Sequence, residues 1–275
     1  MSPKQIAYLK KIKRDNLLIL LVQIIIIAVF LLTWEFLSKY NIINSFIFSS
    51  PSKIIKTLIS LISNHNFFNH LLTTTKEVLI SFGLGFIISL IISILFYLVK
   101  PIYKVFDPFI TMLNSLPKVA IGPLILIWCG ANIKSVIIMA LLINLIVSLV
   151  TIYTGMLNVN KNHLLLFKSF RASKLQTLYY LIIPSSLSSI ISSIKLNLSL
   201  SFIGVIMGEF LVSKEGIGYL IIYGTQVFNL DLVLTGVAVL IILSYIFYKP
   251  IAILESKMLA KTRICQVFLS SIYTY

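Results

Sequence analysis

The chain has 275 residues, of which 59% are apolar and only 11% are charged, and its mean hydropathy is +1.02. A surface of that composition does not suit water, so a soluble fold is excluded. The net charge of +15 does not indicate nucleic-acid binding, because the basic residues lie beside apolar segments instead of forming one patch with interleaved aromatics. Anionic lipid head groups explain them better.

Six apolar segments are predicted to cross a membrane as helices, since backbone polar groups find no water partners in lipid. The clearest are the uncharged runs at 16–34, 78–99 and 135–160, each long enough for a hydrocarbon core of about 30 Å. The first run is expected to be retained, because no small-residue cleavage site follows it. The sequence therefore predicts an all-α integral membrane protein. Its expected spans are 17–36, 78–99, 112–131, 134–155, 186–212 and 232–250.

Charge divides the chain into segments and sets its expected orientation. We expect a cytoplasmic N-terminal segment at 1–16, a membrane domain at 17–255 and a cytoplasmic tail at 256–275. With this topology most of the 23 basic residues lie on the side of the two termini. The positive-inside bias therefore places both termini in the cytoplasm of a multi-pass protein of the cell (plasma) membrane.

Two connections between the spans are long enough to carry structure of their own. The outer loop 38–77 is too polar to span, but the apolar positions after Pro51 predict a short amphipathic helix on the outer membrane surface. The cytoplasmic connection 156–184 mixes apolar and basic residues, which predicts a pair of short helices that dock on a protein partner. The alternative is that this connection lies on the inner head groups. The expected anchors of a docked segment are Phe167, Phe170, Leu175 and Leu178.

The fifth span carries two ionisable residues, which are costly in lipid and therefore candidates for function. Lys195 and Glu209 are separated by about 21 Å of helix, so they are not each other's partners. Snorkelling of Lys195 and a boundary position of Glu209 are the alternatives. With Gly216 and Gly218 of the GIGY turn, Glu209 is predicted to shape an outer gate.

Small residues and prolines mark where helices pack closely or break. The serine-rich face of the fifth span, which includes Ser199, indicates close helix packing or the lining of a solute path. Pro117, Gly122 and Pro123 predict that the third span is kinked or partly broken.

The sequence contains no motif for chemical catalysis. No GxxxxGK[ST] loop is present to cradle a nucleotide, so any ATP must be hydrolysed by another chain. No enzyme activity, metal or other cofactor is expected, because acids, bases and metal ligands do not cluster, and Cys129 and Cys265 are far apart. An ion-gradient-driven secondary carrier remains the alternative, although its usual midplane charges and inverted repeats are not evident.

Several segments resemble one family of transport proteins. Residues 165–184, LLFKSFRASKLQTLYYLIIP, resemble the cytoplasmic EAA loop of binding-protein-dependent importer permeases in their spacing to Pro184. Leu165, Leu166 and Phe167 stand at the EAA positions, and Arg171 replaces the glycine of the family's turn. The other matching segments are PSKI at 51–54, HLLTTTKEVLISFGLG at 70–85, DPFITMLNSLPKVAIGPLILIWCG at 107–130 and GEFLVSKEGIGYLI at 208–221.

The resemblance implies a type I permease of an ATP-driven (ABC) importer, in the subgroup for nitrate, sulfonates, taurine or vitamin precursors. It implies a translocation path for a small solute, two cytoplasmic ATPase subunits, an extracytoplasmic solute-binding protein and a second permease copy in a homodimer. The candidate gate and pathway residues are Ser199, Glu209, Gly216 and Gly218. The candidate coupling residues include the four expected anchors. They are Phe167, Phe170, Arg171, Ala172, Ser173, Lys174, Leu175, Leu178 and Pro184.

Overall fold

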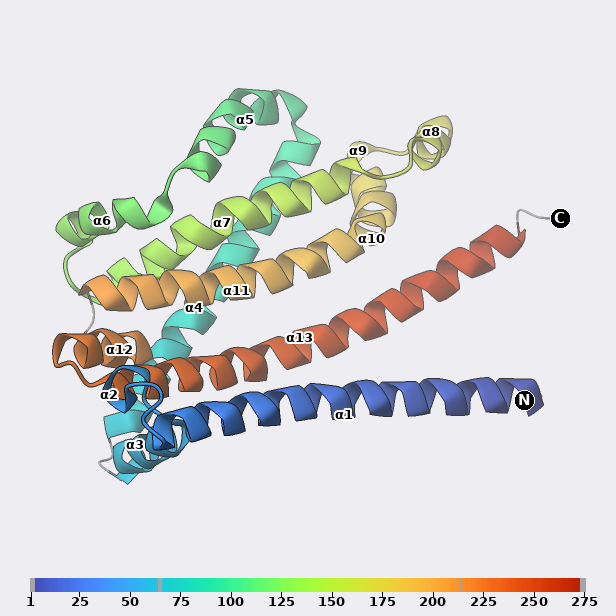
Figure 1. Ribbon diagram of the computed structural model, residues 1–275. Helices are drawn as coiled ribbons and strands as arrows, with labels where there is room; N and C mark the ends of the chain where they lie inside the picture. Colours follow the sequence, from blue (N-terminus) through green and yellow to red (C-terminus); the bar gives the residue numbers. More distant parts are fainter. Residues whose placement is uncertain (1–2, 64–65, 213, 273–275) are drawn as a thin grey trace. The chain divides into compact units, whose positions relative to one another are not determined.

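The computed structural model describes residues 3–63, 66–212 and 214–272, and every regular element among them is a helix (Figure 1). Five helices are long and apolar enough to cross a membrane, and a bent pair of helices makes a sixth candidate. The all-α membrane fold with about six spans is thus confirmed. The five are α1 (Pro3–Lys39), α4 (Asn66–Leu98), α7 (Ile133–Leu157), α11 (Leu187–Val212) and α13 (Leu230–Ile272).

The sixth candidate is broken where the prolines predicted a break. Helix α5 (Lys100–Ser115) and the segment η1–α6 (Lys118–Cys129) meet at an angle of 89°. Leu116 is extended, with ψ of 138°, because the ring of Pro117 disfavours a helical residue before it. The apolar run expected at 112–131 is therefore the second part of a longer bent segment that begins at Lys100.

One compact unit comprises the described parts of 66–223 and 236–275, and its core is a bundle of α4, α7 and α11. Helix α7 packs along both α11 and α4, and in Figure 1 it runs beside α11. Gly204 and Gly208 lie so close to Ala140 and Val136 that a Cβ on either glycine would overlap α7. The small residues of the fifth span therefore serve close helix packing, as one of the two interpretations predicts.

Polar side chains join α7 and α11 deep in the interior of this bundle. The Asn144 amide donates to the Ser201 hydroxyl (2.7 Å), and the Asn197 amide pairs with the Ser148 hydroxyl (2.9 Å). All four residues are fully buried. Such hydrogen bonds between helices satisfy polar groups that lipid cannot, and they fix the register of the bundle.

The second unit comprises the described parts of 1–65 and 224–235. Besides α1 it holds α2 (Ser45–Phe48) and α3 (Pro51–Ser63), which is the amphipathic helix predicted to start at Pro51. The Glu35 carboxylate accepts hydrogen bonds from the backbone N–H of Ser52 (3.0 Å) and from its hydroxyl (2.7 Å). A carboxylate at the positive end of a helix stabilises α3 and holds it against the end of α1.

Three helices extend beyond the predicted segment boundaries. Helix α1 already begins at Pro3, α4 begins at Asn66 within the expected outer loop, and α13 continues through most of the expected tail to Ile272. Lysine and arginine are good helix formers, so the charges that end an apolar run do not end a helix. The last three residues, 273–275, lie outside the described part of the chain.

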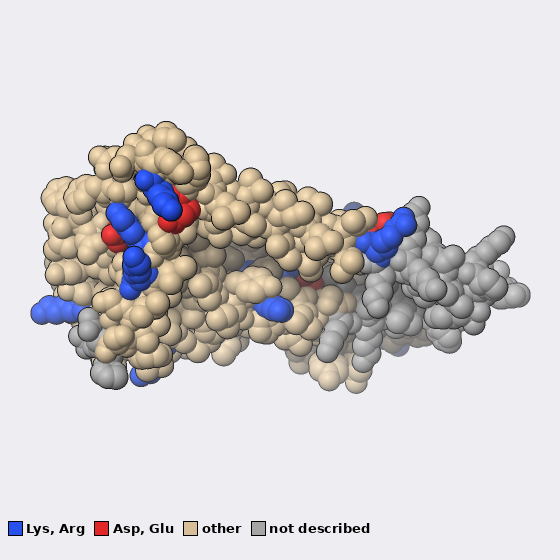
Figure 2. All heavy atoms as spheres, turned by 60° about the horizontal axis from the view of Figure 1, so that its bottom comes forward, with Lys and Arg blue, Asp and Glu red and all other residues tan. Residues whose placement is uncertain are grey.

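The surface of the helices is suited to contact with lipid. Many large apolar side chains of the helices are more than half exposed, among them Leu32, Ile91 and Ile241. Figure 2 shows a face on which charged side chains gather in small clusters separated by wide uncharged areas. Such uncharged areas are expected where a helix faces lipid.

Candidate functional site

The predicted docking connection folds into four short helical pieces between α7 and α11. These are α8 (Lys161–Ser169), α9 (Lys174–Thr177), the π-helical turn η2 (Leu178–Ile182) and α10 (Ile183–Ser185). We refer to residues 161–185 as the α8–α10 segment. The expected pair of short helices, α8 and α9, is confirmed, and α11 follows directly.

A Schellman motif ends α8. The N–H of Arg171 donates to the carbonyl of Lys168 (3.0 Å), and the N–H of Ala172 donates to the carbonyl of Phe167 (3.0 Å). Arg171 therefore takes the left-handed conformation, with φ of 54°. Glycine normally fills this position, because a Cβ makes left-handed backbone costly. The turn geometry implied by the family glycine is thus present here, but an arginine adopts it.

A reciprocal cap starts α9 two residues later. The backbone N–H of Gln176 donates to the Ser173 hydroxyl (3.2 Å), and the Gln176 side chain accepts from the backbone N–H of Ser173 (2.8 Å). Such a capping box satisfies two backbone donors at the start of a helix. Ser173 thus has a structural role within the segment, and the turn between α8 and α9 is fixed by local hydrogen bonds on both sides.

The apolar side chains of this segment divide into an exposed and a buried group. Phe170 and Leu175 are 75% and 65% exposed, and Tyr179 is similarly open. Leu178 is only 6% exposed and packs in a core cluster with Ile152 and Met156 of α7, against which Phe167 also packs. Of the four expected anchors, Phe170 and Leu175 are thus exposed, whereas Leu178 and Phe167 pack against the segment's own bundle. Helical spacing alone did not reveal which face turned inward.

A π turn and Pro184 connect this segment to α11. The N–H of Ile183 donates to the carbonyl of Leu178, five residues earlier. Pro184 has no N–H group, so it cannot continue the α-helical hydrogen bonds here. The N–H of Ser186 resumes the regular pattern by donating to Ile182 (2.8 Å). The segment therefore passes into α11 without a loop.

At the far end of α11, the carboxylate of Glu209 is fully buried and hydrogen bonded on both oxygens. Oε1 accepts from the Thr74 hydroxyl of α4 (2.6 Å), and Oε2 accepts from the backbone N–H of Gly218. The Thr74 hydroxyl in turn accepts from the N–H of Ile217 (2.8 Å). Glu209 and Thr74 thereby bind α4 and α11 to the start of α12 (Ile217–Gln226).

The two predicted glycines make room for this carboxylate. A Cβ on Gly216 or Gly218 would overlap the carboxyl group of Glu209, and Gly216 also has φ of +113°, which side chains rarely permit. The N–H of Gly216 donates to Nδ1 of His70 (3.0 Å), whose ring stacks on Tyr219. The structure thus brings Glu209, Gly216 and Gly218 together, and we call them, with His70 and Thr74, the Glu209 cluster.

The sequence interpretation missed the contribution of α4 to the Glu209 cluster. His70, Thr74 and Glu77 lie at helical spacing on one face of α4, and Glu77 is fully buried with its carboxyl group interacting with that of Glu209. Two acidic groups this close inside a bundle are costly, which marks the position as special. The spacing of these three residues was visible in HLLTTTKEV, but the predicted span began only at Val78.

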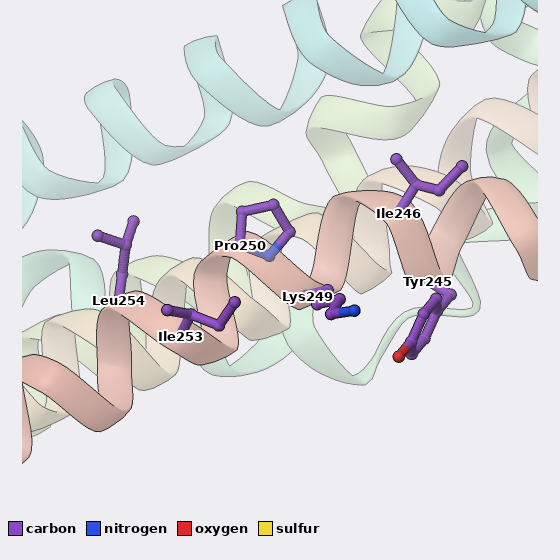
Figure 3. Close-up of a pocket in the computed structure, with 6 residues that line it drawn as sticks. All are labelled: Tyr245, Ile246, Lys249, Pro250, Ile253 and Leu254. Atoms are coloured by element: carbon purple, nitrogen blue, oxygen red, sulfur yellow. The ribbon is translucent and has the colours of Figure 1, made fainter.

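Lys195 pairs with a residue that no local pattern indicates. Its ammonium group forms an ion pair with Glu255 of α13 and lies 5.6 Å from the ring centre of Tyr248. Figure 3 shows the neighbouring face of α13, where Lys249 lies beside Pro250 and extends toward Tyr245. The ammonium group of Lys249 is 5.7 Å from the ring centre of Tyr245. The pair with Glu255 joins α11 to α13.

Ser199 lies on a different face of α11 from the buried polar residues. Ser193, Asn197 and Ser201 are fully buried between helices, whereas Ser199 is exposed. A hydroxyl on the open face of a spanning helix does not contribute to packing in this chain. It is therefore available to a solute path or to another chain.

The side chains at the two ends of α11 hold neighbouring helices together. Within 3–63, 66–212 and 214–272, no group of three or more His, Cys, Asp or Glu side chains is arranged to hold a metal ion. The Glu209 carboxylate already accepts from a hydroxyl and a backbone N–H, so it has a binding role between helices.

Comparisons with known proteins agree on one family. A family model described as a binding-protein-dependent transport system inner membrane component matches residues 85–259. A "Probable ABC transporter permease protein" of Haemophilus influenzae is 28% identical over 83% of this chain and 93% of its own. The formylaminopyrimidine transport permease protein ThiX of Halalkalibacterium halodurans is 28% identical over 68% of this chain and 74% of its own. The taurine transport system permease protein TauC of Escherichia coli is 20% identical over 84% and 86%.

Solved structures show the same fold. A chain of the MetNI methionine ABC transporter in an inward-facing conformation aligns with a TM-score of 0.62 at 16% identity. The alignment covers 70% of this chain and 95% of that one. A second crystal form of the same transporter gives a TM-score of 0.58.

Proposed function

Since the chain belongs to the family of inner-membrane components of binding-protein-dependent transport systems, we propose how it couples solute passage to ATP hydrolysis. The chain is the permease subunit of an ATP-driven importer and not an enzyme. We propose that the α8–α10 segment docks on the ATPase partner and that the Glu209 cluster forms the outer gate. An ion-gradient-driven carrier, the alternative left open by the sequence, is not favoured by this family.

The observation that carries the proposal is the exposed apolar group on the α8–α10 segment. Phe170, Leu175 and Tyr179 lie beyond the end of the α7 span and are mostly exposed, beside Lys168 and Lys174. A protein interface has this layout, with apolar anchors at the centre and charged residues at the rim. Phe170, Leu175 and Tyr179 are the anchors that we propose, because Leu178 and Phe167 are used within the permease.

The segment is built to transmit movement. Local hydrogen bonds fix the turn between α8 and α9, through the Schellman motif at Arg171 and the cap at Ser173. Leu178 packs this turn against the bundle. Because the π turn and Pro184 lead directly into α11, displacement of α9 by the ATPase would displace α11 as well. The ion pair of Lys195 with Glu255 would pass that movement to α13.

The outer gate responds because α11 ends in the Glu209 cluster. Movement of α11 relative to α4 would stretch the hydrogen bond from Thr74 to Glu209 and free the α12 turn at Gly216. Two states separated by a few such bonds can be biased by an ATPase on one side and a solute-loaded protein on the other. Ser199, exposed on α11, is the residue that we assign to the path.

The remaining partners follow from the family and the charge pattern. We propose two ATPase subunits, an extracytoplasmic solute-binding protein, a second copy of this chain and surrounding lipid, with both termini in the cytoplasm. The relatives named for taurine and formylaminopyrimidine support a small polar organic solute, such as a sulfonate or a vitamin precursor.

Crosslinking tests the docking proposal directly. In a chain with Cys129 and Cys265 replaced by serine, Phe170→Cys and Lys174→Cys should each crosslink to the coexpressed ATPase. Lys214→Cys, which follows the far end of α11, is the matched control and should give no such product. If Phe170→Cys and Lys174→Cys both fail to crosslink while uptake remains normal, the α8–α10 segment is not the docking site.

A further inference from the structure

A cavity of about 790 Å³ lies between the start of α5 and the α8–α10 segment. Its apolar part is lined by Tyr97, Leu98, Met156 and Leu157, which come from the ends of α4 and α7. Its polar part is lined by three lysines on three different elements, Lys100, Lys168 and Lys174. The lining of the cavity therefore combines apolar side chains with three basic ones.

The positive charge of this cavity is not neutralised within the described chain. No acidic residue lines it, and none of the three lysines forms a salt bridge or side-chain hydrogen bond with another described residue. Helix α5 also begins here, after Val99, without a side-chain cap. The positive end of a 16-residue helix adds to the attraction for an anion.

The cavity lies at the ends of two candidate membrane spans. The candidate spans of α4 and α7 end at Leu98 and Leu157, and both residues line the cavity. Val99 and Leu157 are 39% and 47% exposed, so part of the apolar lining is open to the surroundings of the helices. A ligand that matches this lining has an anionic head and an apolar tail.

We propose that this cavity binds one anionic phospholipid, with its phosphate at Lys100, Lys168 and Lys174 and an acyl chain beside Leu98 and Leu157. Basic pockets at the ends of spanning helices favour anionic head groups in this way. The bound lipid would tie the start of α5 to α8 and α9, and so hold the α8–α10 segment in place. The cavity shares Lys168 and Lys174 with the rim of the proposed docking surface, but the anchors Phe170 and Leu175 do not line it, and lipid retention by the permease alone is measured without the ATPase.

Lipid retention by the purified full-length chain tests the proposal. Native mass spectrometry in detergent should show that phosphatidylglycerol is retained in preference to phosphatidylcholine with the same acyl chains. The double variant Lys100→Gln/Lys168→Gln should lower the affinity for phosphatidylglycerol about ten- to thirtyfold, as expected for the loss of two lysines at a membrane surface. Added glycerol phosphate at the lipid's concentration should not displace the lipid.

The matched control is Lys104→Gln/Lys161→Gln, which removes two exposed lysines from the same helices, α5 and α8, outside the cavity. It changes the net charge equally and should retain phosphatidylglycerol like the unmodified chain. Equal losses in both double variants would show a diffuse charge effect and overturn the proposal. Displacement by glycerol phosphate would indicate a site for free anions, which also overturns it. So would a cavity variant that retains lipid normally but no longer binds the ATPase, because the cavity would then belong to the protein interface.

Discussion

The two ends of α11 are stabilised in opposite ways. At the Glu209 cluster, hydrogen bonds cross between α4, α11 and the start of α12, and the carboxylate is fully buried. In the α8–α10 segment, the hydrogen bonds belong to local capping motifs, and the largest apolar side chains are left exposed. The first arrangement is complete within the chain, whereas the second leaves a surface for a partner. Substitutions at the two ends should therefore have different consequences.

Leu178→Ala should have the largest effect on stability, because the buried Leu178 side chain attaches the α8–α10 segment to the bundle. Loss of a buried leucine side chain costs about 2–5 kcal/mol of stability. Leu175→Ala, three residues earlier and mostly exposed, is the matched control and should leave the melting temperature of the purified permease unchanged. Equal melting temperatures for the two variants would contradict the division of this segment into a buried group and an exposed docking surface.

Gly216→Ala should disrupt the Glu209 cluster. The new Cβ would overlap the Glu209 carboxyl group, and the positive φ would cost about 1–3 kcal/mol in addition. We expect uptake to fall at least about tenfold while the ATPase still copurifies. Gly83→Ala is the control, since no neighbouring atom lies within 4 Å of the position of its Cβ. Normal uptake by Gly216→Ala would remove the cluster from the gate.

Glu209→Gln replaces one acceptor by a donor where Thr74 and Gly218 both donate. The loss of a hydrogen bond to a charged group costs about 1.5–3 kcal/mol. Uptake should decrease without loss of ATPase binding. Glu77→Gln should be milder, because no backbone N–H donates to Glu77. The reverse order of the two uptake rates would identify Glu77 as the main residue of the pair.

Phe170→Ala should weaken docking without weakening the fold. A central anchor contributes about 1–3 kcal/mol to binding, and Phe170 is too exposed to stabilise the permease itself. Titration of the purified ATPase against the permease measures the change. Lys161→Ala, at the rim of the same segment, should change the affinity little. A drop in permease stability for Phe170→Ala would mean that this side chain is a core residue.

Arg171→Gly should have the smallest effect and the opposite sign. Glycine adopts the left-handed conformation without strain, so the substitution should stabilise the folded permease by about 1 kcal/mol or less. Coupled ATPase activity should be preserved or increased. Arg171→Val, which is stiffer at the same φ, should reduce it. If Arg171→Gly abolishes coupling, the guanidinium group contacts the partner, and turn geometry is not the reason for the residue.

The sequence predicted those features that depend on neighbouring residues. Uncharged runs gave the spans, Pro51 gave the start of α3, and Pro117 gave the break in the sixth candidate span. Each of these depends on a stretch of about 20 residues or fewer, within which backbone sterics and lipid thickness decide the outcome.

The features that the sequence did not predict are contacts between distant segments. Lys195 pairs with Glu255, sixty residues away, and Glu209 is bound by Thr74 from α4. Leu178 and Leu175 are equally apolar, and only the packing of η2 against α7 determines which of them is buried. Such choices are made by tertiary packing, for which a single sequence contains no local pattern.

The π turn at Leu178–Ile182 determines the rotational phase of α11. A π turn contains one more residue than an α-helical turn, so each later residue is rotated by about 100° about the helix axis. Deletion of one residue from this turn would keep the composition and length of α11 almost unchanged. It would nevertheless turn Ser199 and the buried Asn197 toward new neighbours. A single-residue deletion here should therefore be far more harmful than one in the exposed part of α8, where the chain can adjust before the turn.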